Sequence, residues 1–162
     1  MSNVSVYFSL GSNEGDRMRN LSSALSLLDS RLDSHYGALS SIIETPAWGF
    51  EGKPFLNACV RYRIRREGSP ENQALSLLSI CKDIEKELGR RETLEFDKDG
   101  RRIYHNRPID IDILFFGYER IENKDLVIPH GHLLEREFFH GILREISSPY
   151  LRRNFPEYFS RS

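Results

Sequence analysis

The sequence predicts an α+β domain in which two helices pack on one antiparallel sheet. Two observations lead to this prediction: four runs of β-branched and aromatic residues, typical of strands, and two apolar stripes with the spacing of helices. Their order, strand–helix–strand–strand–helix–strand, is the βαββαβ pattern of a ferredoxin-like sandwich. A further helical stripe follows the fourth strand, so we expect a C-terminal helical extension.

A strand followed by a helix is predicted at the start of the chain. Residues 4–10 alternate and are rich in β-branched and aromatic side chains. Apolar residues then recur at helical spacing over residues 17–33, after a good N-cap in Asp16. The connecting loop, residues 11–16, is rich in glycine but matches neither a P-loop nor G-x-G-x-x-G. It is therefore either a tight turn or a ligand loop.

Two more strands are predicted over residues 39–45 and 55–64. The glycine-rich loop between them contains Trp48, which either caps the core or lines a ligand site. At the start of the later strand Phe55 and Asn57 share one face, because side chains two residues apart in a strand point the same way. An aromatic ring beside an amide can bind a flat heterocycle, and a satisfied amide at a strand end is the alternative.

The second helix is predicted to begin at Pro70, a good first helical residue, and to be ended by Gly89. A charged, flexible loop follows over residues 90–106, and a loop of this length is either a functional lid or a solvated segment. It carries arginines that would suit a polyphosphate: Arg90, Arg91, Arg101 and Arg102. A last helix is predicted over residues 133–146, followed by an irregular C-terminal wrap over residues 147–162.

The fourth strand, residues 109–116, combines a buried apolar pattern with two acidic residues. Asp110 and Asp112 point to one face, while the isoleucines between and beside them point to the other. Adjacent carboxylates repel each other unless a cation lies between them, and hard oxygen ligands suit Mg²⁺. Arg107, just upstream, suits a polyphosphate. We therefore favour a metal site over the alternative, an edge strand whose acidic face is solvated.

The composition predicts one domain over residues 1–162 and argues against several classes of protein. A net charge of −1 gives no global basic field, so no nucleic-acid partner is expected. No apolar run approaches the length of a membrane span, and the N-terminus lacks the pattern of a signal peptide. We therefore expect a cytoplasmic protein with no membrane partner, and a monomer, with a dimer as the alternative.

The spacing of cysteines and histidines predicts no further metal site. Cys59 and Cys81 lie far apart in apolar surroundings, which favours two buried thiols over a disulfide or a zinc site. His130 and His132 bracket a glycine in a loop, and together with His140 they lack an obvious fourth zinc ligand. The sequence therefore disfavours zinc.

Two rival functions are open from these residues alone. A ferredoxin-like module that binds single-stranded RNA would stack bases on Phe55 and Tyr7, but it has no use for adjacent carboxylates, which repel phosphates without a metal. A two-metal nuclease would use Asp110 and Asp112, but it leaves the pairing of Phe55 with Asn57 unexplained.

Several motifs occur along the chain in one order. They are Gly11-Ser12-Asn13 with Gly15-Asp16, Glu44-Thr45-Pro46, Phe55-Leu56-Asn57-Ala58, Ile84-Glu85 with Gly89-Arg90, Arg107-Pro108-Ile109-Asp110-Ile111-Asp112-Ile113-Leu114, and Ile128-Pro129-His130 with Arg136 and Phe138. In this set and order the chain resembles the 6-hydroxymethyl-7,8-dihydropterin pyrophosphokinase family over roughly residues 4–145. The acidic strand and the Pro-His pair are the most specific of these motifs.

The resemblance implies an enzyme of folate biosynthesis, a diphosphotransferase that acts on small molecules. It would transfer pyrophosphate from ATP, its co-substrate, to the hydroxymethyl group of the pterin, giving AMP and the pterin diphosphate. Asp110 and Asp112 would hold two Mg²⁺ ions between the pterin hydroxyl and the triphosphate. Such transfer needs positioning and charge neutralisation, which a metal pair supplies.

The resemblance also implies roles for individual residues. Catalysis would depend on Asp110, Asp112, Arg90 and Arg107. The residues implied to bind ATP are Lys82, Glu85, Arg90, Arg107, Ile113, His130 and Arg136. Those implied to bind the pterin are Thr45, Pro46, Trp48, Phe55, Asn57, Asp110 and Phe138, with Phe55 and Phe138 as the aromatic faces on either side of the ring.

The chain departs from the family pattern in the basic loop. Tyr104-His105-Asn106 stands where the family usually has tryptophan-glycine-proline, and Tyr104 is the candidate replacement for the tryptophan. Glu92 stands where a second arginine commonly follows Arg90. The candidates for that phosphate contact are therefore Arg91, Arg101 and Arg102.

Overall fold

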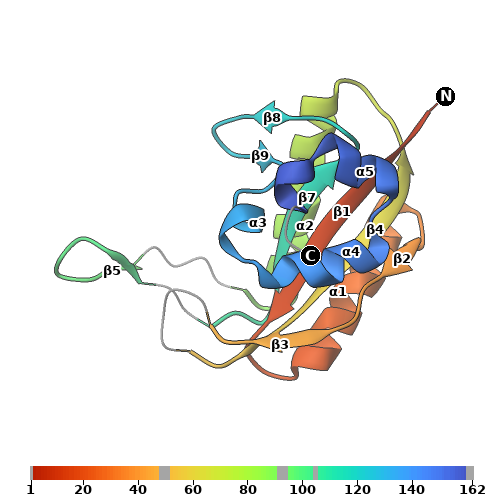
Figure 1. Cartoon of the computed structure of the whole chain (residues 1–162). Helices are drawn as coiled ribbons and strands as arrows, with labels where there is room; N and C mark the ends of the chain where they lie inside the picture. The colour runs from red at the N-terminus through yellow and green to blue at the C-terminus, as the bar shows by residue number, and fades with distance from the viewer. Residues whose placement is uncertain (1, 48–51, 91–94, 104–105, 160–162) are drawn as a thin grey trace.

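The computed structural model describes residues 2–47, 52–90, 95–103 and 106–159 (Figure 1). Its antiparallel sheet contains three long strands, β1 (Asn3–Ser12), β4 (Phe55–Arg65) and β7 (Asp110–Phe116), and two short ones, β2 (Ala38–Leu39) and β3 (Ile43–Thr45). The strand order is β2-β4-β1-β7, and β3 also pairs with β4. Each of these pairings is antiparallel. The predicted combination of an antiparallel sheet with packed helices is confirmed.

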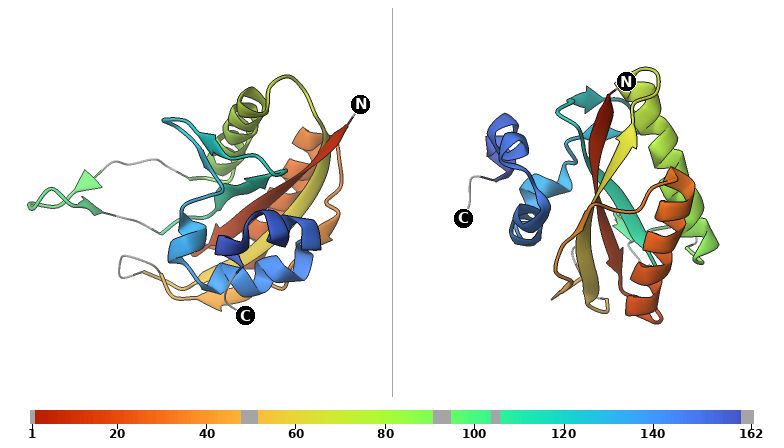
Figure 2. Two further views of the ribbon diagram at one scale, coloured as in Figure 1. Left: turned by 45° about the horizontal axis from the view of Figure 1, so that its top comes forward. Right: turned by 90° about the vertical axis from the view of Figure 1, so that its right-hand side faces the viewer.

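Helices lie on both faces of the sheet. The long helices α1 (Arg17–Leu32) and α2 (Pro70–Glu87) cover one face, and the C-terminal helices α3 (His132–Glu135), α4 (Phe138–Ile146) and α5 (Pro149–Asn154) lie on the other (Figure 2). Both long helices begin as predicted, because the side chains of Asp16 and Ser69 accept hydrogen bonds from main-chain N–H groups of the first turn.

The sheet separates two hydrophobic cores. Ile111 and Ile113 of β7 pack in the core under α1 and α2, while Phe115 belongs to the core under the C-terminal helices. The register between β1 and β7 shifts next to Tyr7, and this irregularity lets the consecutive residues Leu114 and Phe115 enter the same core. The strand that carries the acidic pair is therefore anchored on both faces.

The strand predicted over residues 39–45 is divided in two in the structure. Ser40 interrupts it: its main-chain N–H donates to the carbonyl of Cys59, and its hydroxyl accepts from the Cys59 N–H. The main-chain N–H and hydroxyl of Ser41 both donate to the carboxylate of Glu145 on α4. Serine side chains thus replace part of the strand pairing, which the apolar pattern could not indicate.

The prediction of an irregular wrap after residue 147 was wrong. Ser148 caps α5, with Pro149 in its first turn, and the 3₁₀ helix η1 (Pro156–Tyr158) follows. Phe155 and Tyr158 lie with their ring centroids 5.3 and 5.9 Å from that of Phe115. The Ser-Pro start was a helix signal in the sequence, and the aromatic residues after it complete the second core.

Two small hairpins lie beside the main sheet. In the basic loop, β5 (Glu95–Phe96) pairs with β6 (Arg102–Ile103), around a turn in which Asp97 accepts hydrogen bonds from the main-chain N–H groups of Asp99 and Arg101. This hairpin projects away from the sheet (Figure 1). The other hairpin, β8 (Ile121–Glu122) with β9 (Val127–Ile128), leads to His130. Among the described residues, no helix is long and apolar enough to cross a membrane.

Candidate active site

The two carboxylates predicted from the acidic strand lie together at the start of β7. The side chains of Ile109, Ile111 and Ile113 are buried in the core, whereas those of Asp110 and Asp112 are 20% and 25% exposed. The alternation expected from the sequence is therefore present. Because β7 is at one edge of the main sheet, groups from α2 and from the segment after β9 can reach this acidic face.

Two arginines neutralise Asp110. Nη1 of Arg90 lies 3.0 Å from Oδ1 of Asp110, and Nη1 of Arg107 lies 3.4 Å from the same oxygen. Arg90 comes just after α2 and Arg107 just before β7, so a helix end and a strand start bring the pair together. The Arg90 side chain is only 13% exposed, which makes this a fixed, partly desolvated cationic group.

Glu85 joins α2 to the edge of β7. Its Oε2 accepts a hydrogen bond of 2.8 Å from the main-chain N–H of Ile111 and lies 2.7 Å from Nη1 of Arg90. Burial, and then the nearby charge of Asp110, raise the pKa of Glu85 to about 7, although Arg90 opposes this shift. Glu85 thus fixes the main chain between the two aspartates and orients Arg90.

Asp112 lies close to a histidine. Its Oδ1 lies 3.6 Å from Nε2 of His130. Burial raises the pKa of Asp112 well above its usual value, and the charges of Asp110 and Glu85 add to this shift. Three carboxylates therefore crowd a partly desolvated place, where Arg136 and Arg90 offset part of their negative charge.

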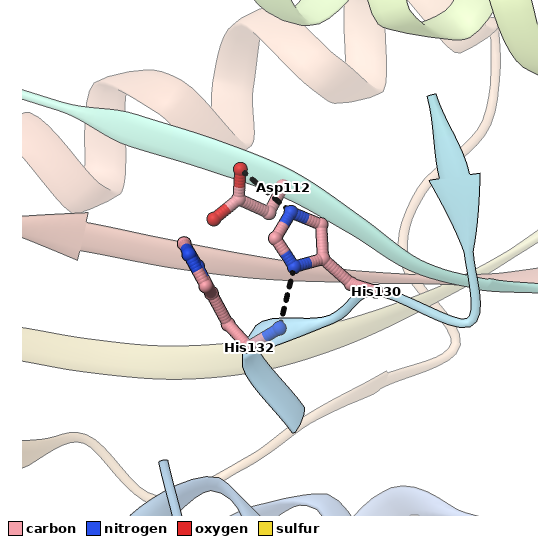
Figure 3. A group of neighbouring side chains, drawn as sticks. All are labelled: Asp112, His130 and His132. Atoms are coloured by element: carbon pink, nitrogen blue, oxygen red, sulfur yellow. Dashed lines mark hydrogen bonds and ion pairs between the residues drawn. The ribbon is translucent and has the colours of Figure 1, made fainter. Parts of the chain in front are cut away.

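The segment after β9 supplies His130 and His132 to this place (Figure 3). The main-chain N–H of His130 donates to the carbonyl of Leu114, which ties the segment to β7. Burial, followed by the neighbouring His132, lowers the pKa of His130 to about 4, so its imidazole is neutral at physiological pH. His140, the third histidine of the motif, is not in this group, because its Nε2 hydrogen-bonds the carbonyl of Leu133 at 2.7 Å.

Asn13 fixes the entry to the acidic strand, and sequence reasoning did not identify this role. Its side chain accepts a 2.6 Å hydrogen bond from the N–H of Arg107 and donates to the carbonyl of Lys53 and the side chain of Asn106, at 3.0 and 2.9 Å. Its own N–H donates to the carbonyl of Arg107. Asn13 is completely buried. The glycine loop that carries it is therefore a connecting element between two loops of the site.

The residues predicted to bind a flat ring gather where β1, β3 and β4 meet. Nδ2 of Asn57 donates to Oγ1 of Thr45 at 2.6 Å, and both side chains are buried. Gly11 lies opposite: a Cβ there would approach Oδ1 of Asn57 to 2.9 Å and Cδ1 of Phe55 to 3.4 Å. Any larger residue than glycine would displace this pair. Pro46 is exposed next to Thr45.

The other predicted site residues are more scattered. Phe138 begins α4, half-buried, with its ring 4.5 Å from that of Phe139. Arg136 stands between α3 and α4, and Lys82 is exposed on α2, one turn before Glu85. The Ile113 side chain is buried in the core, so a contact with a nucleotide would have to come from its main chain. The predictions for Trp48, Arg91 and Tyr104, and for the Arg102 side chain, fall outside the described residues, and Arg101 is exposed on the hairpin.

Comparison with known proteins identifies a family for nearly the whole chain. Residues 7–148 match the family model described as 7,8-dihydro-6-hydroxymethylpterin-pyrophosphokinase (HPPK). The chain is 40% identical over 153 residues to the 2-amino-4-hydroxy-6-hydroxymethyldihydropteridine pyrophosphokinase of Porphyromonas gingivalis, covering 93% of this chain and 95% of that protein. It is 39% identical over 138 residues to a folate synthesis bifunctional protein of Arabidopsis thaliana, covering 82% of this chain and 25% of that protein.

A solved structure has a similar fold. The protein in the crystal structure described as HPPK-DHPS in complex with substrates aligns with a TM-score of 0.58 at 16% sequence identity. The alignment covers 98% of this chain and 44% of the solved chain, so this chain spans less than half the length of that protein. At this identity the likeness concerns the fold.

Proposed function

The chain belongs to the 7,8-dihydro-6-hydroxymethylpterin-pyrophosphokinase family, and we propose that it transfers pyrophosphate from ATP to the hydroxymethyl oxygen of 6-hydroxymethyl-7,8-dihydropterin with the help of two Mg²⁺ ions. It is a diphosphotransferase, a pyrophosphokinase of folate biosynthesis. The observation that carries the proposed mechanism is the start of β7, where Asp110 and Asp112 meet Arg90, Arg107 and His130.

The chemistry of the acidic face fits magnesium. Asp110 and Asp112 offer hard carboxylate oxygens on one face of a strand. Burial, and then the negative charges of Asp110 and Glu85, raise the pKa of Asp112, so a cation bound there would be stabilised. Bound there, Mg²⁺ would neutralise charge on the phosphate oxygens of the nucleotide. Asp110 and Asp112 would be the protein ligands, and phosphate oxygens and water would complete the coordination.

The basic groups around this face suit a triphosphate. Arg90 and Arg107 converge on one oxygen of Asp110, so each guanidinium is already oriented toward the acidic face before a nucleotide binds. An arginine can exchange a carboxylate partner for a phosphate oxygen, and a phosphate can accept two parallel hydrogen bonds from one guanidinium. We infer that Arg90, Arg107, His130 and Arg136 hold the phosphates, and that Lys82 and Glu85 lie toward the base of the nucleotide.

The pterin would bind beside these groups, at the junction of β1, β3 and β4. Phe55 and Phe138 would cover the two faces of the ring, and Asn57, with Thr45, Pro46 and Trp48, would contact its polar edge. Support comes from Asn57, whose amide is held by Thr45 in a buried, fixed orientation. A buried amide with one fixed partner can discriminate a hydrogen-bonding ring from an apolar one.

The proposed mechanism needs no covalent intermediate between the substrate and the protein. The reacting hydroxyl and the triphosphate have to be placed in line, and the charge on the transferred group has to be neutralised. Asp110 belongs to the proposed pterin site and to the proposed metal site, so it would place the pterin hydroxyl next to the metal-bound nucleotide. The half-buried position of Arg90 and Arg107 strengthens their interaction with phosphate, because water screens it less.

We also infer that the sheet and its two long helices form a ferredoxin-like sandwich. The strand order β2-β4-β1-β7, with antiparallel pairs and a helix after each of β1 and β4, supports this. We propose that the active enzyme is a monomer, with a dimer as the alternative.

The test is the formation of AMP from ATP in the presence of Mg²⁺ and 6-hydroxymethyl-7,8-dihydropterin. We expect AMP and the pterin diphosphate in equal amounts, and neither product with 6-methyl-7,8-dihydropterin, which lacks the acceptor oxygen. Release of ADP instead of AMP, or AMP release that does not depend on the acceptor, would contradict the proposal.

A further inference from the structure

We propose that Asp112, His130 and His132 bind one divalent transition-metal ion of the zinc class, and that an ion in this place competes with the magnesium nucleotide. The first part stands on the positions of three side chains. The second part rests on the proposed function, since it assumes that Asp112 and His130 belong to the nucleotide site. The sequence disfavoured zinc because it grouped the wrong residues: Asp112, from a distant strand, completes the set in place of His140.

The ligand atoms of the three residues are close to one another. One atom from each, a carboxylate oxygen and two ring nitrogens, all lie within 4.8 Å of each other, and Nε2 of His130 is 3.6 Å from Oδ1 of Asp112. Zinc–ligand bonds of about 2.0–2.2 Å in a tetrahedron place the donor atoms roughly 3.3 Å apart. Small side-chain rotations therefore suffice to close the set around an ion (Figure 3).

The chemistry of the ligands selects against magnesium in this set. Imidazole nitrogens suit zinc and its neighbours among the transition metals, whereas magnesium prefers oxygen ligands and retains water. Three protein ligands with a fourth position left to water are the pattern of an accessible zinc site. Asp110 is held by two arginines, so Asp112 is the carboxylate of the pair that can turn toward the histidines.

The backbone holds the three residues in rigid surroundings. Asp112 lies inside β7, next to Ser9 of β1, and the N–H of His130 is bonded to the Leu114 carbonyl of the same strand. His132 begins α3, which packs through the buried Leu133. The segment is thus attached to β7 near the ligand atoms, so that the site is largely preformed.

A hydrogen bond within the pair of histidines gives this proposal a specific signature. The main-chain N–H of His132 donates to Nδ1 of His130 at 3.2 Å, which leaves the ring proton of a neutral His130 on Nε2. Coordination through Nε2 requires that this proton leave, with the ring then protonated at Nδ1. The hydrogen bond from His132 opens at the same time. Metal binding therefore changes the tautomer of His130.

The first experiment is calorimetric titration of Zn²⁺ into the metal-free protein, without an affinity tag, for wild type, His132→Ala and His35→Ala. His35 is an exposed histidine paired with Asp29, far along the chain from the proposed ligands, and is the matched control. We expect one zinc per chain in wild type and His35→Ala. We expect at least about 100-fold weaker binding in His132→Ala, because loss of an outer partner alone costs roughly 10–100-fold. Equal affinity in all three proteins, or no binding in wild type, would overturn the site.

Nitrogen NMR of the histidine rings and a turnover assay separate the two parts of the proposal. Zn²⁺ should move the His130 ring proton from Nε2 to Nδ1, and an unchanged tautomer with zinc bound would place the metal elsewhere. In the AMP assay we expect zinc to inhibit wild type in competition with magnesium nucleotide, and His132→Ala to resist this inhibition. Inhibition of equal strength in both would refute the competition. An enzyme without any turnover would refute the proposed function but leave the zinc titration as it stands.

Discussion

Asp110 and Asp112 are two residues apart on β7, yet their surroundings differ. Asp110 meets Arg90 and Arg107, whereas Asp112 meets His130 and has a strongly raised pKa caused first by burial. Asp110 therefore has close arginine partners, whereas at Asp112 burial outweighs the opposing charges of Arg136 and Arg90. Both aspartates are therefore proposed as Mg²⁺ ligands. Only Asp112 is proposed to bind a transition metal together with His130 and His132.

Replacing either carboxylate should abolish turnover without unfolding the protein. For Asp110→Ala and Asp112→Ala we expect a fall in kcat on the order of 10²–10³-fold or more, because a charge-stabilising group at the reacting phosphate is lost. The melting temperature should be unchanged or higher in Asp112→Ala, since like-charge crowding is relieved. Asp99→Ala, in the exposed hairpin turn, is the control. Normal turnover of either variant at saturating Mg²⁺ would contradict the metal assignment.

The buried carboxyl of Glu85 should make stability depend on pH. Its pKa is raised from the usual 4.5 to about 7 by burial and by Asp110, so the folded protein holds this proton more tightly than the unfolded chain. The stabilising contribution of the protonated form is present below about pH 4.5 and is lost as the pH rises through about 7.

The side chain in the Glu85→Gln variant cannot ionise. The difference in unfolding free energy between wild type and this variant should therefore reveal the contribution of Glu85 to the pH dependence of stability. In EDTA, we expect the free energy of unfolding of wild type to fall relative to Glu85→Gln between pH 4.5 and 7, by on the order of 1–3 kcal/mol. Urea unfolding at several pH values measures it, with the exposed Glu67→Gln as a control for loss of one negative charge. A difference between wild type and Glu85→Gln that stays constant with pH would contradict the raised pKa.

At the level of residues, the spacing predicted the acidic pair, and the resemblance implied that Arg90, Arg107 and His130 belong to the site, but neither gave the contacts among them. Strand periodicity is local, so the shared face of Asp110 and Asp112 followed from their spacing. The bond from Glu85 to the Ile111 N–H depends on how α2 lies along the sheet edge, which no local pattern contains. His132 was seen only as a member of a histidine cluster, because its proximity to Asp112 is a tertiary feature.

Among the elements, the loop after β1 has the clearest structural role. The buried Asn13 holds the Lys53 carbonyl, the Asn106 side chain and both main-chain polar groups of Arg107. It thereby joins the loop before β4 to the entry of β7. The sequence allowed two interpretations of this loop, a tight turn or a ligand loop. In the structure its buried Asn13 connects the neighbouring loops by hydrogen bonds.

Asn13→Ala should loosen this junction. We expect a loss of about 2–4 kcal/mol in the free energy of unfolding, since several buried groups lose their hydrogen-bond partner together. The KM for the pterin should also rise, because the start of β4 carries Phe55 and Asn57. Urea unfolding and steady-state kinetics measure the two effects, with the exposed Asn72→Ala on α2 as a matched control. A stability equal to that of the control would rule out this role.

We propose that the basic loop that carries the hairpin β5–β6 closes over the site as a lid when both substrates are bound. The hairpin pairs within itself and projects from the sheet, and its Arg101 is exposed (Figure 1). We expect amide hydrogen exchange over residues 95–103 to slow when a non-hydrolysable ATP analogue, Mg²⁺ and the pterin are all bound, because lid closure excludes water. The turn 67–69, which joins β4 to α2, is the internal reference. Equal exchange rates with and without both ligands would contradict a lid.

The ends of helices and strands could be predicted where a capping residue marked them or where apolar residues recurred regularly over a long stretch. Asp16, Ser69 and Pro70 marked the helix starts correctly. The second strand was predicted as continuous because its strand-like pattern runs without a break over residues 39–45. Its division at Ser40 depends on a hydrogen bond between the Ser40 hydroxyl and β4. The helix α5 was missed although Ser148 and Pro149 signal it, since its Leu151 packs in the same core as Phe115, which is a tertiary feature.

For the whole molecule, the arrangement of the sheet explains where the site lies. The end of β1 and the starts of β4 and β7 come together at one end of the sheet, because both neighbours of β1 run antiparallel to it. The acidic strand, the ring-binding residues and the Asn13 loop are thereby collected from distant parts of the sequence. The antiparallel sheet with packed helices could be anticipated from the order of the elements, but the distances among these groups could not.

The most direct test of this arrangement is calorimetry in two steps. A non-hydrolysable ATP analogue is titrated into the protein with Mg²⁺, and 6-hydroxymethylpterin is then titrated into that complex. We expect pterin binding that requires both nucleotide and metal, because in the proposed mechanism the acidic pair joins the two substrate sites through the metal. Pterin binding of equal strength without nucleotide and Mg²⁺, or no pterin binding at all, would contradict a shared metal site on β7.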